Sequence, residues 1–497
     1  MKKWLLALFV LAVSLDLGLT FVQNYHLPFE GDLPTIVVPS IDYAPILKDP
    51  FGWGVLRHGA YYVGPNRFFL HGGMYWYFRH VPLWLQHFFS PITSAYVAMA
   101  LSTTAMQALL LYVLGWYATG TRRLNSFRLW LAMVLMMPLF QSSGYHMQMG
   151  LVTRSIAFAW AYTLPLLLLL VLYWPLYRAV RWGQPLRLPW WQVVAMLLLA
   201  VVLALSGPLL PGTVAVLGAG LALHAAWPRW RAGQWSVAVW RWFPGQALLV
   251  WGWLGALCLY SLYIGSHNAE NFAFHVSIAE RYQLLPLGVF KVLTVRLGLP
   301  LLLLACLGNQ WLLRRRVPPS AESQRLALLL RWVGWFALGY VLLLPLGGYR
   351  GYRPLLVRFD TILPIAIGLV GFYGASTAYL LGQLAGRARH WYVGGVLVLA
   401  AIFINSDLGY YPGDNNICER QALERLSHAS PAPVVALPEN CAVLNWEASG
   451  DPNESLLAAT MLVHWRIMPR IQLFYHPGGR ILPSDGANHS PANLAAK

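Results

Sequence analysis

Long apolar runs recur along the whole of this 497-residue chain. A run of roughly 17 to 25 apolar residues is long enough to cross a hydrocarbon core of about 30 Å as a helix. Because a membrane-spanning segment must satisfy its own backbone polar groups, such runs predict helices. We find about eleven of them, at residues 4–22, 92–117, 129–142, 156–177, 190–206, 211–226, 245–264, 292–313, 327–345, 361–383 and 391–409.

The composition supports a membrane protein. Hydrophobic residues make up 58% of the chain and charged residues only 11%, whereas soluble domains average about 25% charged residues. The runs at 129–142 and 211–226 are short, and Pro138 and Pro208 lie in or beside them, which leaves the helix count open by about one. The sequence therefore predicts an all-α polytopic membrane protein.

Short basic loops indicate how the chain is oriented. Lysine and arginine accumulate in loops that stay in the cytoplasm. If Lys2 and Lys3 lie inside, five alternate loops lie inside too, and all are basic; their arginines are Arg122, Arg123, Arg128, Arg178, Arg181, Arg187, Arg229, Arg231, Arg241, Arg314, Arg315, Arg316, Arg325, Arg387 and Arg389. The net charge of +17 is then largely a topology signal, and arginines spread over separate loops do not form a nucleic-acid groove.

This orientation divides the chain into four parts. Residues 1–22 form an N-terminal transmembrane helix or signal anchor, 23–91 a first extracytoplasmic loop, 92–409 a helical bundle and 410–497 an extracytoplasmic C-terminal segment. A cleaved signal peptide is the alternative for residues 1–22, although apolar sequence continues beyond Asp16 and favours a retained helix. A charge there is costly, so Asp16 should face protein or water. We expect a multi-pass protein of a bacterial inner membrane, with a cytoplasmic N-terminus.

Local patterns give further expectations for the two extracytoplasmic parts. Aromatic and His residues at helical spacing between 75 and 89 predict an interfacial helix, bent or restarted at Pro82. Residues 434–437 read as a strand in a small mixed domain, and the sequence after about 477 as a disordered tail. Cys418 and Cys441 lie where an oxidising compartment permits a disulfide, whereas Cys258 and Cys306 read as core residues.

Two acids in the first loop are the leading candidates for chemistry. Of the 18 acidic residues, only Glu322 falls on the cytoplasmic side, although loop lengths explain most of this asymmetry. Glu30 and Asp32 lie between two prolines, and in an extended backbone they would project to one side about 6.5 Å apart. Such a pair can hold a substrate hydroxyl, act as a general base or share a divalent cation. The alternative is a turn with two solvated acids; Asp42 and Asp49 are weaker candidates.

The loop between the ninth and tenth runs is the second candidate. It carries arginines on the side where topology does not require them, and an arginine fork suits bidentate phosphate binding. The alternative is that they reach lipid headgroups. The candidate substrate-binding residues are Arg350, Tyr352, Arg353, Arg358 and Asp360, where Asp360 is also a simple ion-pair partner for Arg358. Weaker members of the same extracytoplasmic set are Arg67, His71, His146, Arg154 and His267.

In plan the chain resembles the GT-C superfamily of polytopic glycosyltransferases. The matching features are an N-terminal helix, a large acidic outer loop behind it, about ten further helices and an outer C-terminal segment. The resemblance implies sugar transfer from a polyprenyl-phosphate donor at the extracytoplasmic face. It also implies that Glu30 or Asp32 is the base and that Arg350, Arg353 and Arg358 hold the lipid phosphate. Many members place two acids side by side, whereas Gly31 separates them here.

Two other classes of function remain open. A transporter or flippase-like lipid carrier would carry paired charges along the middle of several helices, often in repeated halves. A non-catalytic scaffold would tolerate loss of every outer acid. The chain has no C-x-x-C, H-E-x-x-H, phosphate-binding loop or dinucleotide motif, so zinc protease, ATPase and dinucleotide-enzyme readings have no support.

Overall fold

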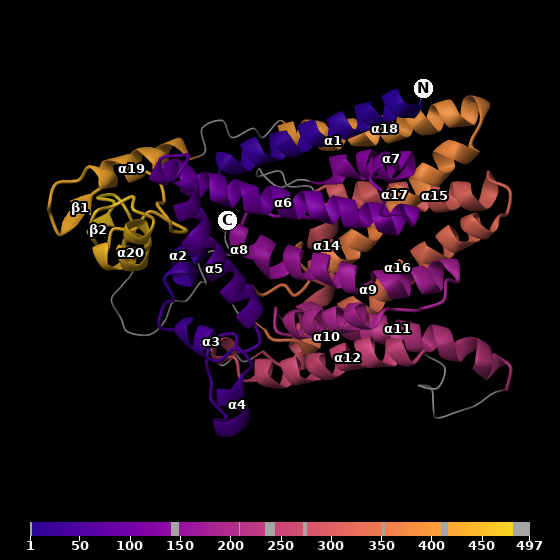
Figure 1. Cartoon of the computed structure of the whole chain (residues 1–497), viewed down its shortest axis with the longest axis horizontal. Coiled ribbons are helices and arrows are strands. Elements are labelled where there is room, and N and C mark those ends of the chain that lie inside the picture. Colours follow the sequence, from indigo (N-terminus) through magenta and orange to yellow (C-terminus); the bar gives the residue numbers. More distant parts are fainter. Residues whose placement is uncertain are drawn as a thin grey trace.

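Long helices run side by side through most of the molecule, and shorter elements gather at one end of them (Figure 1). The computed structural model describes residues 2–140, 149–207, 209–233, 244–271, 276–349, 353–408 and 416–480. The long helices and the apolar helices packed among them are α1 (Lys2–Tyr25), α6 (Pro91–Thr119), α7 (Phe127–Met136), α9 (Leu164–Trp182), α10 (Trp190–Ala204), α11 (Leu209–Arg231), α12 (Gly245–Ser266), α14 (Leu285–Thr294), α15 (Gly298–Arg315), α16 (Ala321–Leu343), α17 (Leu363–Gln383) and α18 (Gly386–Leu408).

The remaining elements are short, apart from α5. The helices are α2 (Asp32–Val37), α3 (Ala44–Lys48), α4 (Trp53–His58), α5 (Phe68–Leu85), α8 (Ile156–Phe158), α13 (Ile278–Gln283), α19 (Ile417–Ser427) and α20 (Leu456–His464). The strands are β1 (Val434–Ala436) and β2 (Leu473–Tyr475), and single turns of tighter or wider helix lie at Met137–Leu139, Ala159–Thr163, Ala269–Asn271, Leu344–Leu346 and Pro452–Ser455.

The prediction of a helical, multi-pass protein is confirmed. Within the described residues, eight helices are long and apolar enough to cross a membrane, and α7 and α10 are shorter apolar helices. The run expected at 292–313 is not one straight span, because α14 and α15 meet at 84° across a break at residues 295–297. Arg296 lies in this break, and a charged side chain within a span is costly.

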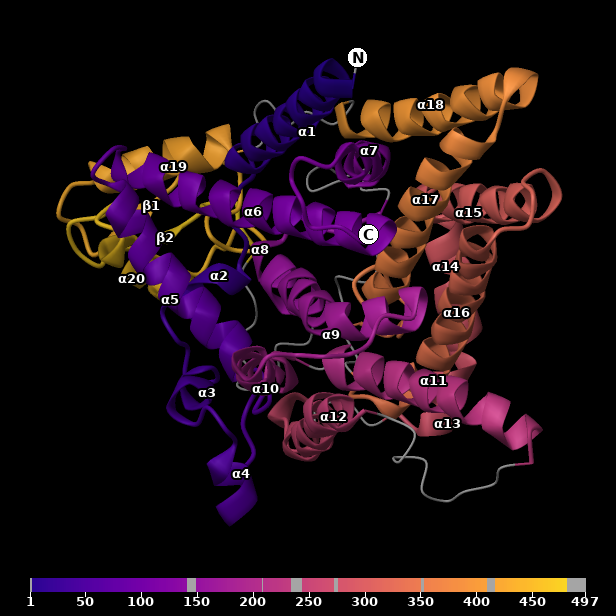
Figure 2. The same cartoon turned by 45° about the vertical axis from the view of Figure 1, so that its right-hand side comes forward.

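Central and peripheral helices differ in burial. Within their apolar windows, 67% of the residues of α6 and α17 are buried, against 11% in α1 and α18. Gly374 of α17 faces Met136 of α7, whose Cγ would lie 2.5 Å from a Cβ at that position, so these helices approach closely only because the residue is glycine. The helices α6 and α17 form the centre of the bundle, and α1 and α18 lie at its margin (Figure 2).

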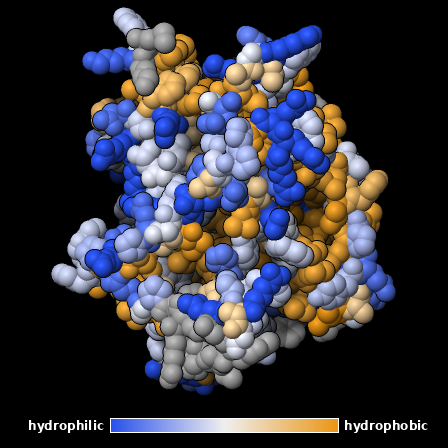
Figure 3. Space-filling model, turned by 90° about the vertical axis from the view of Figure 1, so that its right-hand side faces the viewer, coloured by the Kyte–Doolittle hydropathy of each residue, from blue (hydrophilic) through white to orange (hydrophobic). Residues whose placement is uncertain are grey.

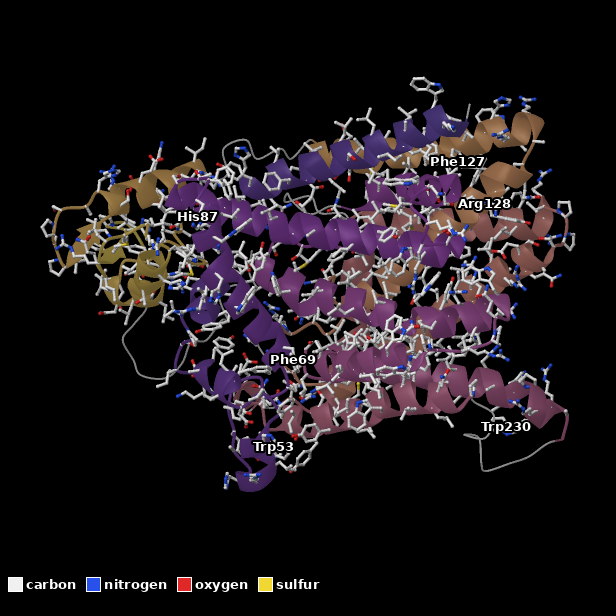
Figure 4. All side chains as sticks on the ribbon, in the orientation of Figure 1. Trp53, Phe69, His87, Phe127, Arg128 and Trp230 are labelled. Carbon is white, nitrogen blue, oxygen red and sulfur yellow. A yellow bond between two sulfur atoms is a disulfide. The ribbon has the colours of Figure 1, made fainter. Side chains whose placement is uncertain are left out.

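The two ends of the bundle are chemically different. Arg128 and Trp230 mark one end, whereas His87 and Trp53 mark the other (Figure 4). We call the first the basic end; hydrophilic side chains spread over it, with hydrophobic ones between and beside them (Figure 3). Its single expected acid, Glu322, pairs with Arg181 at 2.9 Å and Arg325 at 3.8 Å.

The opposite end carries what we call the cap, residues 26–90 and 416–480. Two regions far apart in sequence build one hydrophobic core there: Leu33 and Val37 of α2 pack with Leu423 of α19 and Met461 of α20. The two regions approach closely at Gly31, since a Cβ on this residue would lie 2.6 Å from Cδ1 of Trp446 and 2.9 Å from the Trp446 backbone nitrogen. The first loop and the C-terminal segment therefore form one folded unit, not two separate ones.

One backbone carbonyl shows how closely the two parts of the cap depend on each other. The expected helix at 75–89 is present as α5, but it continues through Pro82. Proline has no N–H, so the carbonyl of Phe78 loses its helical partner. The indole N–H of the buried Trp465 donates to that carbonyl at 2.7 Å. The C-terminal segment thus stabilises a helix of the first loop.

The C-terminal part of the cap contains both helices and strands, as predicted. The strand expected at 434–437 is β1, which pairs in parallel with β2, with Val435 opposite Phe474. Cys418 and Cys441, the expected pair, are joined by a disulfide that closes a loop of 23 residues between α19 and the chain after β1. Cys258 and Cys306 are buried in the bundle.

Candidate functional site

Glu30 is enclosed where the cap meets the bundle. Its Oε1 accepts a hydrogen bond from the backbone N–H of Ala157, and its carboxylate also bonds Ser155. Both partners lie at the start of the helical segment Ile156–Trp182, where the first N–H groups of a helix lack helical partners. The second oxygen, Oε2, is buried and has no hydrogen-bond partner. Glu30 is therefore held by its bonds to Ala157 and Ser155, and one of its two carboxylate oxygens is buried without a hydrogen-bond partner among the described residues.

Burial sets the acidity of this group. It raises the pKa of Glu30 to about 7, against the lowering effect of the bonds to Ser155 and Ala157. The nearby charge of Asp32 raises the pKa further, and the charge of Arg154 lowers it. A carboxylate with a pKa near 7 is suited to accept a proton at neutral pH.

The backbone around Asp32 differs from the expected one. Gly31 has helical dihedral angles and Asp32 opens α2, so the pair does not lie on an extended strand. Pro34 favours this arrangement, because the first turn of a helix leaves its N–H groups unbonded and a missing N–H costs nothing there. Asp32 therefore acts on Glu30 electrostatically, from the first turn of a neighbouring helix.

The arginine loop between α16 and α17 forms a network around Asp360. Arg358 donates to both carboxylate oxygens of Asp360 at 3.0 Å and to the carbonyl of Leu355 at 2.9 Å. Arg353 lies 3.7 Å from the same carboxylate. Arg358 is thus engaged within its own loop, where it fixes Asp360, and Arg353 forms a longer ion pair with the same carboxylate.

Arg353 also reaches the segment that holds Glu30. Its guanidinium lies 4.5 Å from the ring centre of Phe158, the residue after Ala157. Two more arginines belong to this region. Arg154 interacts electrostatically with both Glu30 and Arg296, and Arg296 lies 4.9 Å from the ring of Phe359, which follows Arg358. The segment 154–158 therefore links the carboxylate to three arginines from separate parts of the chain.

Several expected site residues lie elsewhere or outside the described residues. Arg350, Tyr352 and His146 lie outside the described residues. Arg67 pairs with Glu270 at 3.7 Å, and the ring of His71 packs on Tyr43 at 4.9 Å.

The remaining weaker candidates have local contacts. Asp49 accepts hydrogen bonds from the N–H groups of Trp53 and Gly54, which supports the start of α4. His267 packs against Tyr61 and Tyr263. Asp42 is exposed.

The sequence analysis did not single out Glu419, a buried acid of the cap with hydrogen bonds to both oxygens. Its carboxylate accepts from the N–H of Phe29 at 2.9 Å, the hydroxyl of Tyr96 at 2.7 Å and the N–H of Leu444 at 3.0 Å. Burial raises its pKa to about 7, opposed by these three donors and by Arg420. Glu419 joins the first loop, α6 and the C-terminal segment. Its position beside Cys418 is the one sequence signal for such a role.

Among the described residues, no group of three or more His, Cys, Asp and Glu side chains is placed to hold a metal ion. The fold and site define the class of protein: a largely helical protein with multiple helices able to span a membrane, and a buried carboxylate beside arginines at its cap. Comparison of the chain with known protein families and with curated proteins gave no match.

Proposed function

We propose that the protein is an integral membrane glycosyltransferase that transfers a sugar from a polyprenyl-phosphate donor to an acceptor hydroxyl. The observation that carries the proposal is the position of Glu30: among the described residues it is a buried carboxylate with one unpartnered oxygen, and it is bonded to Ala157, next to the Phe158 ring that Arg353 contacts. A base and cationic groups in reach of one another are what this reaction needs.

Glu30 is the better of the two candidate bases. Its raised pKa, about 7, allows it to accept a proton from a hydroxyl and to release it again at neutral pH. Its free Oε2 offers the acceptor position, while the bond from Ala157 fixes the carboxylate. Asp32 serves as a positioning charge, because its carboxylate raises the pKa of Glu30.

Arg353 and Arg154 are the better candidates for the donor phosphate. Arg358 is bonded to Asp360 through two nitrogens and holds the loop in shape. Arg353 lies on Phe158 and at 3.7 Å from Asp360, so its charge stands beside the segment that bonds Glu30. Arg154 comes from the segment that carries Ser155 and Ala157, which brings its charge close to the base.

The reaction follows from these roles. Glu30 accepts the proton of the acceptor hydroxyl as that oxygen forms a bond to C1 of the sugar. The bond between C1 and the phosphate oxygen breaks, and its electron pair leaves with the polyprenyl phosphate. Arginine charge stabilises the negative charge that develops on this leaving group. Attack from the face opposite the phosphate inverts the configuration at C1.

The proposed location places the cap at the extracytoplasmic face of a bacterial inner membrane. Arg128 and the Arg181–Glu322 pair belong to the basic end, and basic loops stay in the cytoplasm. The Cys418–Cys441 disulfide belongs to the cap, and disulfides persist in oxidising compartments. A cap on the outer side would receive sugars from polyprenyl carriers at that face. Membrane lipids would surround the helical bundle.

The test compares the glycans and glycolipids of cells that lack the protein and are complemented with variants. Glu30→Gln should abolish the sugar-bearing product, since an amide cannot accept the proton. Asp32→Asn should leave a reduced amount of the product, because it changes the pKa of Glu30 but leaves the Glu30 carboxylate in place. Glu424→Gln, which removes an exposed charge from the cap, should leave the product unchanged.

Protein levels in the membrane must be equal for this comparison, and blotting against a tag checks them. Full retention of the product by both Glu30→Gln and Asp32→Asn would rule out a first-loop carboxylate as base. Loss of product in Asp32→Asn alone would instead assign the base to Asp32.

A further inference from the structure

A polar ladder lies inside the bundle where α1, α6 and α18 meet, apart from Glu30 and its arginines. Asp16, Thr20 and Gln23 follow one another along one face of α1 at helical spacing. Gln107 of α6 donates to Asp16 at 3.4 Å and to the Thr20 hydroxyl at 2.9 Å, and Gln23 donates to Asp407 of α18 at 3.2 Å. Asp16 therefore faces protein, as the sequence predicted.

The ladder has more acceptors than donors. The amide nitrogens of Gln23 and Gln107 point at carboxylate or hydroxyl oxygens, which fixes the orientation of both amides. Both glutamines are almost completely buried, at 0% and 1% exposed. The oxygens Oε1 of Gln23, Oε1 of Gln107 and Oδ1 of Asp407 are buried without a hydrogen-bond partner. Burying these three oxygens, close to the carboxylates of Asp16 and Asp407, costs free energy unless a positive group binds them.

The protein does not supply that group from the described residues. Within that part of the chain, neither Asp16 nor Asp407 takes part in an ion pair, although the two carboxylates interact electrostatically. Helix α6 contains no charged residue, and the basic residues of α1 and α18 lie at the opposite ends of those helices. The two carboxyl groups of the ladder thus have no basic side chain as a partner within the described part of the chain.

We propose that this ladder binds a hard cation, which enters from the cap end. Carboxylate, amide and hydroxyl oxygens are the ligands that Na⁺, Mg²⁺ and Ca²⁺ prefer. Asp407 and Gln23 lie in the last turn of their helices, next to the cap, and Asp16 lies about 10 Å deeper along α1. One ion satisfies several oxygens at once, which a single proton does not.

The bound ion would fasten the marginal helices α1 and α18 to the centre of the bundle. Only 11% of the residues in the apolar windows of α1 and α18 are buried, against 67% in α6, the third helix of the ladder. Ordered water in place of an ion is the alternative occupant. Water would satisfy the oxygens without distinguishing one salt from another, and the experiment separates the two cases.

The experiment measures the melting temperature of the purified full-length protein in lipid nanodiscs. NaCl, MgCl₂ and CaCl₂ are each titrated against N-methylglucamine chloride at constant ionic strength. A cation that binds the folded state should raise the melting temperature and reach saturation. Asp407→Asn and Gln23→Leu should each weaken this response at least tenfold. Gln310→Leu is the matched control, since Gln310 also has a buried unpartnered Oε1 but lies in α15.

Three results would overturn the proposal. The first is a melting temperature of the wild-type protein that is the same in every salt. The second is an unchanged response in both Asp407→Asn and Gln23→Leu. If these variants do not fold, binding of radioactive sodium or calcium to the wild-type protein decides the matter, and the absence of saturable binding would exclude the site. This outcome is independent of whether the protein transfers sugars.

Discussion

Glu30 and Glu419 show how two buried acids of one cap come to have different roles. Burial raises the pKa of each to about 7. Both oxygens of Glu419 are bonded, to donors from three parts of the chain, whereas Oε2 of Glu30 has no partner. A fully bonded carboxylate organises structure, and a carboxylate with an unused oxygen can bind or react. The surroundings of a residue, more than its pKa, distinguish the two cases.

Glu419 should make the stability of the cap depend on pH. A folded-state pKa above the unfolded value of 4.5 means that the folded state binds the proton more tightly. The resulting stabilisation is complete below pH 4.5 and is lost as pH rises toward 7. The difference amounts to about 3 kcal/mol. The melting temperature of the wild-type protein should therefore fall between pH 5 and pH 8.

Glu419→Gln should flatten this dependence, because the amide does not titrate, even though it lowers stability by replacing an acceptor with a donor. Glu30 shares the same pH window, so part of the slope should remain. Glu424→Gln in the same helix is exposed and should keep the full slope. Equal slopes for wild type and Glu419→Gln would show that Glu419 stays ionised throughout.

At the scale of single elements, α5 depends on a partner from the other end of the chain. Replacing Trp465 with Phe removes the indole N–H that bonds the Phe78 carbonyl but keeps most of the buried aromatic surface. A buried carbonyl left without a donor costs about 1 to 3 kcal/mol. Trp465→Phe should lower the free energy of unfolding of the cap by about that amount, measured by denaturant titration of protein in detergent.

Trp84→Phe supplies the control for this prediction, because Trp84 is 61% exposed and lies in α5 itself. Its effect should be within about 0.5 kcal/mol of zero. A cost for Trp465→Phe no larger than that of Trp84→Phe would contradict the role of the Phe78 bond in completing α5.

Local signals explain which elements the sequence predicts well. Length and hydropathy locate the apolar helices, because every spanning segment must be apolar and must bond its own backbone. The break between α14 and α15 has one sequence signal, Arg296, which is an arginine within an apolar run. The prediction of a single span at 292–313 overlooks this arginine. The extended backbone expected between the two prolines is wrong, because Pro34 lies in the first turn of α2, where a proline favours the helix.

At the scale of the whole molecule, the candidate site depends on contacts between distant segments. Residue type and the side of the membrane predict Glu30, Arg353 and Arg358 as candidate site residues. The partners of Glu30, at Ser155 and Ala157, lie 125 and 127 positions further along, and no local pattern indicates that pairing. The shared core of the first loop and the C-terminal segment is equally non-local. Only the packed chain brings one carboxylate and several arginines to a single segment.

The central claim is that Glu30 is the base of a sugar transfer at the cap. The most direct measurement is the release of polyprenyl phosphate by the purified protein, supplied with polyprenyl-phosphate sugars and acceptor lipids, as a function of pH. The base works when ionised, so release by the wild-type protein should rise with pH and level off above about 7. Glu30→Gln should show no release at any pH, at unchanged thermal stability. Release by Glu30→Gln at the wild-type rate, with the same pH profile, would contradict the claim.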